Sequence, residues 1–228
     1  MIGRHLTHFW DEEHSLTALL LLLVVEVFII VPATRAGHAL ALISVIVFSF
    51  LLLAGLLTMA RHRIVQVVSG GFVICAIAAR LARSVFDVPG LLQWDALLSI
   101  LSVIGMVIVV LWQVYREGPV TSHRVRGAIA AYLLIAILFA YVYTFIDSVL
   151  PGAFQLPVWA QAGAERGEMF FYFSMVALTT TGFGDITAIH PFARSFVTLE
   201  GFIGTLYPAI LIARIVTLEL ETRRSGKG

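Results

Sequence analysis

The sequence predicts an all-α membrane protein with six transmembrane helices and one shorter helix that enters the membrane without crossing it. Hydrophobic residues make up 60% of the 228 residues and charged residues 13%, and the mean hydropathy is +0.96. A soluble domain carries roughly a quarter charged residues, whereas apolar runs long enough to span a lipid bilayer recur along this chain. The net charge of +1 is not gathered in a basic patch, so no nucleic-acid partner is predicted.

The first half of the chain predicts a four-helix transmembrane domain at residues 15–115, after a cytoplasmic N-terminal segment at residues 1–14. Pro32 ends the first helix, and Val88-Pro89-Gly90 turns the chain before the fourth. The histidines and acids of the first segment match no recognised metal-ligand spacing, which favours a solvated segment over a metal site. The four helices are expected at residues 15–32, 38–60, 64–86 and 91–115.

The second half predicts two further spanning helices with the shorter helix between them, together covering residues 127–218. Gly118 and Pro119 interrupt the helical pattern in a cytoplasmic linker at residues 116–126. The spanning helices are expected at residues 127–150 and 194–218, the shorter helix at 168–180 and a cytoplasmic tail at 219–228. The front domain is thus followed by a two-helix module with a re-entrant helix and loop.

Arginines and the single lysine predict the orientation, because cytoplasmic loops carry an excess of positive charge. With both termini inside the cell, three arginines fall in outer loops: Arg35, Arg166 and Arg194. The cytoplasmic ends then hold Arg4, Arg61, Arg63, Arg116, Arg124, Arg126, Arg214, Arg223, Arg224 and Lys227. The expected location is the cell membrane, with both termini cytoplasmic.

Ionisable residues also occur at membrane depth in the first four helices. Glu26 lies in the first helix, Arg80 and Arg83 in the third and Asp95 in the fourth. Unpaired charges at this depth are costly, so we expect these four residues to form a salt-bridged cluster. Such a cluster is either a static clasp between the helices or part of a moving element.

Residues 179–185 read Thr-Thr-Thr-Gly-Phe-Gly-Asp and join the shorter helix to the last one. Glycines that alternate with larger residues allow successive carbonyl oxygens to face the same way. A row of such oxygens can replace the water around a dehydrated cation. With the Thr180 hydroxyl at one end, four oxygen-lined sites are expected at the carbonyls of Thr180, Thr181, Gly182 and Phe183.

Two other interpretations of this stretch are a small-residue helix break and a phosphate-binding loop. Phosphate loops use a helix N-terminus and usually a lysine. Here the preceding helix presents its C-terminus, and the only lysine is Lys227. Both observations favour the cation-binding interpretation.

The motif resembles the selectivity filter of the potassium channel family, which reads T-V-G-Y-G-D. Tyr172-Phe173-Ser174 and Leu178 resemble the end of that family's pore helix, and Pro191 and Arg194 resemble its entry into the inner helix. The resemblance covers residues 127–218. It implies a pore domain made of an outer helix, a pore helix, a filter and an inner helix.

The family resemblance also implies a function. Such a protein conducts K⁺ passively as a homotetramer, with K⁺ as the permeant ion, three identical subunits as partners, no cofactor and no enzymatic activity. The fourth helix, residues 91–115, lacks the arginines of a voltage sensor, so gating by that route is not expected. The resemblance assigns ion binding to Thr180, Thr181, Gly182, Phe183 and Gly184.

Two positions depart from the family pattern. Thr181 stands at the valine position and Phe183 at the tyrosine position, so the phenolic hydroxyl that ties the family's filter to its pore helix is missing. A weakly selective monovalent cation channel on the same fold is therefore the alternative to a potassium-selective one.

Four neighbouring residues are expected to support the filter and its outer mouth. Thr179 precedes the filter, and Tyr172 belongs to an aromatic group on the pore helix. Glu168 and Asp185 place negative charge at the outer mouth, which raises the local concentration of cations.

The last helix contains candidate gating residues. Gly201 and Gly204 allow bending, and Pro208 removes a helical hydrogen bond. Packing of small residues against the fifth helix explains the glycines equally well. Glu200, a charged residue at membrane depth, is expected to hydrogen-bond to the back of the pore helix.

Other functional classes are less well supported by the sequence. An intramembrane hydrolase needs a nucleophile and a base together, and neither G-x-S-x-G nor H-E-x-x-H occurs. A non-conducting membrane scaffold remains as an alternative.

Overall fold

The computed structural model describes residues 12–30, 70–75, 77–78, 90–115, 122–157 and 166–225, together with residues 47 and 67. This part of the chain is mostly helical, and three of its helices are long and apolar enough to cross a membrane. They are Leu91–Tyr115, Arg124–Val149 and Pro191–Thr217. The expected helices at 38–60 and 64–86 lie largely outside the described residues, so the count of six remains a prediction.

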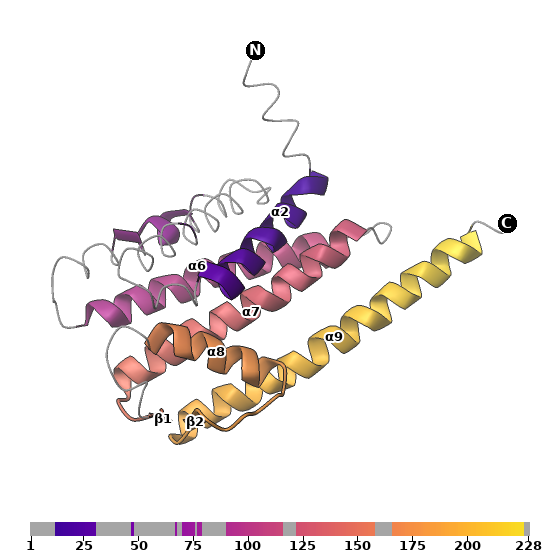
Figure 1. The fold of residues 1–228 in the computed structure, drawn as a ribbon. Coiled ribbons are helices and arrows are strands. Elements are labelled where there is room, and N and C mark those ends of the chain that lie inside the picture. Colours follow the sequence, from indigo (N-terminus) through magenta and orange to yellow (C-terminus); the bar gives the residue numbers. More distant parts are fainter. Residues whose placement is uncertain are drawn as a thin grey trace, which may run out of the picture.

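The first expected helix is observed as α2, Glu12–Val25, which continues as the π-helix η1, Glu26–Ile30 (Figure 1). Its buried side chains recur three or four residues apart, the spacing that places them on one face of a helix. Leucines and valines also occupy exposed positions on the other faces, as expected of a helix in lipid rather than in water. The buried positions are Leu16, Leu19, Leu23 and Val27.

The next helix, α6, spans Leu91–Tyr115, the residues expected for the fourth helix, and follows Gly90, whose φ is 87°. Helix α7, Ser122–Val149, begins before the expected residue 127, because the last helix-breaking residue upstream is Pro119. It ends at a turn in which the Ala153 amide donates to the Leu150 carbonyl (3.0 Å). Pro151 followed by Gly152, with φ of 84°, is the residue pair that a type II turn favours.

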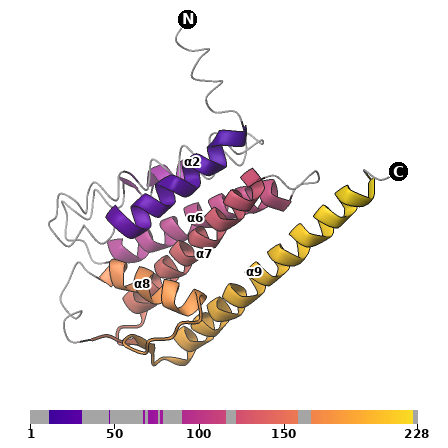
Figure 2. The ribbon, with the colours of Figure 1, turned by 45° about the vertical axis from the view of Figure 1, so that its right-hand side comes forward.

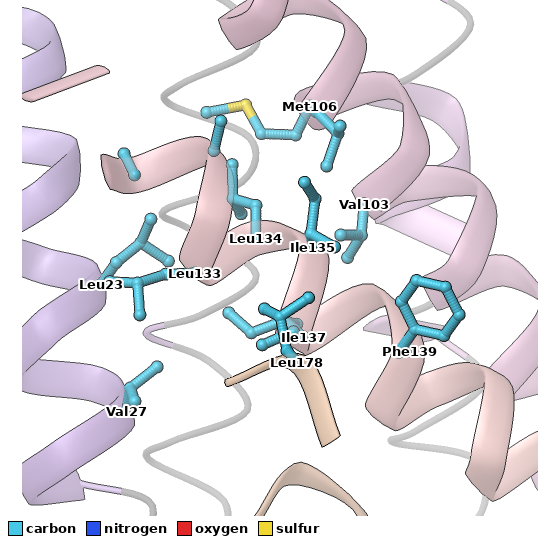
Figure 3. Close-up of a cluster of buried hydrophobic side chains, with 14 of the residues drawn as sticks. Leu23, Val27, Val103, Met106, Leu133, Leu134, Ile135, Ile137, Phe139 and Leu178 are labelled. Atoms are coloured by element: carbon cyan, nitrogen blue, oxygen red, sulfur yellow. The ribbon is translucent and has the colours of Figure 1, made fainter. Parts of the chain in front are cut away.

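The apolar core lies where α7 packs against α2 and α6. Figure 3 shows Leu23 of α2 and Val27 of η1 on the side of Leu133 of α7, with Val103 and Met106 of α6 on the other side. Leu178, the last residue of the shorter helix, reaches the same cluster. The core therefore connects the front helices to the start of the predicted filter.

The shorter helix, α8, spans Arg166–Leu178 and lies against α7 and the first turns of the last helix, α9, Pro191–Ser225 (Figure 2). Between α8 and α9 the chain forms a loop and one short strand, β2, Thr187–Ala188. This strand pairs antiparallel with β1, Phe154–Gln155, which follows the end of α7. The two-stranded sheet is a departure from the expected all-α class.

Candidate ion-binding loop

The backbone of the loop after α8 alternates in handedness. Thr180, Gly182 and Gly184 have φ angles of 57°, 61° and 77°, whereas Thr181 and Phe183, between them, do not have positive φ. A Cβ atom at either glycine would meet open space, so only the backbone conformation favours glycine there. A β-branched residue with positive φ is unusual and is typical of functional sites, which makes the Thr180 conformation informative.

The amide groups of this loop face the C-terminus of α8. The amides of Thr181 and Gly182 both donate to the Val176 carbonyl, at 2.9 and 3.4 Å, and the Thr180 amide donates to the Ala177 carbonyl at 3.0 Å. These bonds satisfy carbonyl groups that the end of a helix leaves unpaired. Among the described residues, the carbonyl oxygens of residues 180–183 accept no hydrogen bond.

The threonine hydroxyls attach the same loop to α8. The Thr179 hydroxyl donates to the Met175 carbonyl (2.7 Å) and lies 2.8 Å from the Thr181 hydroxyl. The Thr180 hydroxyl donates to the Thr179 carbonyl at 2.7 Å. Thr181, at the position where the family has valine, thus adds a polar contact within the loop.

The end of the loop that leads to α9 is fixed on two sides. The Asp185 carboxylate accepts a hydrogen bond from the Tyr172 hydroxyl of α8. The sheet formed by β1 and β2 then joins the following residues to the segment after α7, and the Ile189 amide donates to the Ala153 carbonyl at 2.8 Å. Glu168, the other expected mouth residue, lies in the first turn of α8.

Glu200 lies behind the loop and is fully buried. Its two carboxyl oxygens contact the hydroxyls of Ser174 on α8 and Tyr143 on α7. The predicted hydrogen bond from Glu200 to the back of the shorter helix is therefore confirmed. The Ser174 hydroxyl also lies 2.7 Å from the Ala136 carbonyl of α7.

The aromatic residues of α8 divide between two environments. Phe170 and Phe173 are buried and pack against Tyr143 and Phe154, with ring centroids 4.9 to 6.4 Å apart. Tyr172 is partly exposed, and its hydroxyl contacts the Asp185 side chain at the end of the loop. Of the four aromatic rings of α8, Phe170 and Phe173 therefore anchor the helix to α7 and β1, Phe171 is partly buried against the core, and Tyr172 supports the loop.

Gly204 lies in tight contact with the end of α8. A Cβ atom there would overlap the Leu178 carbonyl oxygen and lie 2.7 Å from its carbonyl carbon, whereas one at Gly201 would lie 3.7 Å from the Ala177 oxygen. The two glycines, which were expected to pack against the fifth helix, therefore lie against α8 instead. Helix α9 continues through Pro208 to Ser225.

The expected charge cluster is only partly covered by the structure. Glu26 and Asp95 are buried, and the Asp95 carboxylate accepts from the Ser99 hydroxyl at 3.5 Å. Arg80 and Arg83 lie outside the described residues. Pairing of these arginines with the two acids remains a prediction.

Residues 127–220 match a family described as "Ion channel". The match places this segment with ion channels. It begins within α7 and ends within α9, so it contains α8 and the loop of alternating handedness. The comparisons with curated proteins and with solved structures gave no match. With three helices able to cross a bilayer, the chain is a membrane protein that carries an ion channel segment.

Sequence reasoning missed two tyrosines that hold this segment together and an arginine that attaches it to α6. The Tyr132 hydroxyl of α7 donates to the Leu178 carbonyl (3.1 Å), and the Tyr143 hydroxyl donates to Glu200. Arg214 donates to the Tyr115 carbonyl at 2.7 Å and stacks over its ring. The two tyrosines could have been found from the sequence. Their spacing places them on one face of an apolar helix, and a buried hydroxyl needs a hydrogen-bond partner.

Proposed function

We propose that this chain is one subunit of a homotetrameric potassium-selective channel that conducts K⁺ passively across the cell membrane. The observation that carries the proposal is the loop at residues 180–184, with alternating φ and with amides bonded to α8. When right- and left-handed residues alternate, successive N–H groups turn to one side of the chain. The carbonyl oxygens then occupy the other side, where they would bind dehydrated K⁺ at Thr180, Thr181, Gly182 and Phe183.

The length of α8 supports a re-entrant arrangement. Its 13 residues extend about 20 Å, which is less than the roughly 30 Å of a bilayer's hydrocarbon core. A helix that enters from the outer face would therefore end within the membrane. Its C-terminus carries partial negative charge, which favours a cation at that depth.

Four copies are proposed because a single chain supplies only one wall of the ion path. Residues 179–185 are exposed in the single chain, and Phe183 is 68% exposed. The adjoining face of α9 is exposed and apolar as well. Cyclic symmetry would cover both surfaces with identical neighbours and close the path.

The second candidate is a weakly selective monovalent cation channel. Phe183 lacks the phenolic hydroxyl of the family pattern, so one tie between the loop and α8 is absent. The polar contact of Thr181 with Thr179 and the bond between Tyr172 and Asp185 support a rigid, selective loop instead.

Reconstituted vesicles test the function directly. With unequal K⁺ concentrations on the two sides and Na⁺ making up the difference, we expect a reversal potential close to the K⁺ equilibrium value. A reversal potential near zero would support the weakly selective channel, and the absence of flux would contradict channel function.

A further inference from the structure

Glu200 is the centre of a hydrogen-bonded network that joins α7, α8 and α9. Its side chain is 0% exposed. The Tyr143 hydroxyl contacts Oε2 and the Ser174 hydroxyl contacts Oε1. The Ser174 hydroxyl also lies 2.7 Å from the Ala136 carbonyl oxygen. The network therefore contains three contacts between oxygen atoms.

The protons available for these contacts can be counted. Each contact between two oxygens requires one hydrogen atom between them. The Ala136 carbonyl and an ionised carboxylate are acceptors only, so Tyr143 and Ser174 would supply two protons for three contacts. A protonated carboxyl group supplies the third. Glu200 then donates from Oε1 to Ser174, Ser174 donates to Ala136, and Tyr143 donates to Oε2.

We propose that Glu200 is held in its protonated, uncharged form, donates to Ser174, and is a positioning residue for the ion-binding loop. This proposal rests on the proposed function in one respect, the role of the loop in conduction. The protonation state follows from the network itself.

The groups around Glu200 favour the uncharged form. From α7, Tyr143 is in contact, Tyr132 is within electrostatic reach, and the buried Asp147 lies one turn beyond Tyr143. From α8 the contact is Ser174. Among the described residues, no cationic side chain pairs with Glu200. A buried carboxylate without a cationic partner is strongly disfavoured.

Two other charged side chains lie on the helices that the network joins. On α9, Arg194 is exposed and donates to the Ala188 carbonyl at 3.0 Å. Glu168 lies in the first turn of α8, well before Ser174 in the helix. Arg194 therefore does not supply the counter-charge that an ionised Glu200 would need, and Glu168, an acid, would add negative charge.

The network can position the loop because Ser174 lies one helical turn before Leu178, the last residue of α8. The loop follows immediately, and its amides bond to Val176 on the same helix. A displacement of α8 would therefore move the loop carbonyls. Glu200 thus supplies a polar tie between α8 and α9, and Phe183 cannot supply the tie that a tyrosine at its position makes in the family.

Infrared difference spectroscopy of the purified full chain tests the protonation state. Subtracting the spectrum of Glu200→Gln from that of the parent at neutral pH isolates this one carboxyl among the buried acids. We expect the loss of a protonated-carboxyl C=O band that shifts in D₂O, with the carboxylate bands unchanged. Loss of carboxylate absorption instead would overturn the proposal.

Three variants test the positioning role. Glutamine keeps a donor and an acceptor in place, so the melting temperature and the K⁺-to-Na⁺ permeability ratio of Glu200→Gln should equal those of the parent. Glu200→Ala and Ser174→Ala should both lower the melting temperature, and Glu200→Ala should reduce the ratio by roughly tenfold because buried hydroxyls lose their partner. A Glu200→Gln variant that behaves like Glu200→Ala would contradict the proposal.

A rise in the melting temperature of Glu200→Gln would also contradict it, because that result is expected when a buried charge is removed. The infrared and melting measurements do not depend on conduction. If the parent carries no flux, the proposed function fails while the protonation of Glu200 is still decided.

Discussion

Helices α7 and α9 are both long and apolar, yet their surroundings within one chain differ. In the most apolar stretch of α7, 61% of the residues are buried, compared with 11% in α9. Helix α7 packs against α2, α6, α8 and α9, whereas α9 is buried mainly along the face that contains Ala193, Glu200 and Gly204. The apolar surface of α7 is therefore covered mainly by helices of its own chain. The open face of α9 adjoins the exposed loop, and other copies of the chain would cover both.

The largest effect is expected at the packed face of α9. Gly204→Ala places a methyl group on the backbone of Leu178, which cannot move aside as a side chain could. Overpacking of this kind costs about 1–3 kcal/mol or more. Gly201→Ala is the matched control, because its methyl group makes an ordinary contact at 3.7 Å. Thermal melting of the purified protein compares them, and equal melting temperatures would contradict the observed packing.

The open face of α9 is tested by a polar substitution. Phe202 and, on α6, Ile108 are each 60% exposed in the single chain. If α9 faces other subunits, Phe202→Ser should shift the assembly from tetramers to smaller species, whereas Ile108→Ser should leave tetramers intact. Native mass spectrometry in detergent measures both. An intact tetramer in Phe202→Ser would place lipid, not protein, on this face.

The loop conformation is tested with two glycines of similar geometry. Gly182 and Gly152 have φ angles of 61° and 84°, and both have open space at the Cβ position. Alanine at either site should cost about 1–2 kcal/mol, because L-residues disfavour the left-handed region. Only Gly182→Ala should abolish K⁺ flux in vesicles. Equal flux in the two variants would remove the loop from the ion path.

The smallest effect is expected at two tyrosines that bridge α7 to its neighbours. Tyr132→Phe removes the bond to the Leu178 carbonyl, and Tyr207→Phe removes a bond of 2.9 Å to the Ala128 carbonyl. Each should lower the free energy of unfolding by about 1 kcal/mol. Tyr132→Phe should also reduce K⁺ selectivity, since the loop follows directly after Leu178. A selectivity loss of the same size in Tyr207→Phe would argue against a specific role for Tyr132.

Two features of the structure, the bounds of α6 and the contact of Glu200 with α8, could be predicted from the sequence. Helix α6 was predicted at its observed residues because Gly90 and Arg116 flank a long apolar run in which Asp95 is the one charged residue. The bond between Glu200 and α8 was predicted because a carboxyl at membrane depth needs a partner. The first prediction depends only on neighbouring residues along the chain, and the second on the high cost of an unpaired carboxyl group within a membrane.

Other features could not be predicted from one sequence. The partner of Gly204 depends on the rotation of α9 about its axis, and apolar residues on several faces of that helix leave the rotation undetermined. The positive φ of Thr180 contradicts the preference of a β-branched residue and arises from the loop as a whole. The pairing of β1 with β2 joins segments separated by α8, with two residues in each strand, too few to show a strand pattern.

The most direct test of the central claim is a structure of the purified assembly with Tl⁺ in place of K⁺, because its anomalous scattering locates the ion. The claim predicts Tl⁺ on a fourfold axis, within coordination distance of the carbonyl oxygens of residues 180–183 from four chains. Tl⁺ bound elsewhere, or residues 180–183 lying away from the symmetry axis, would contradict it.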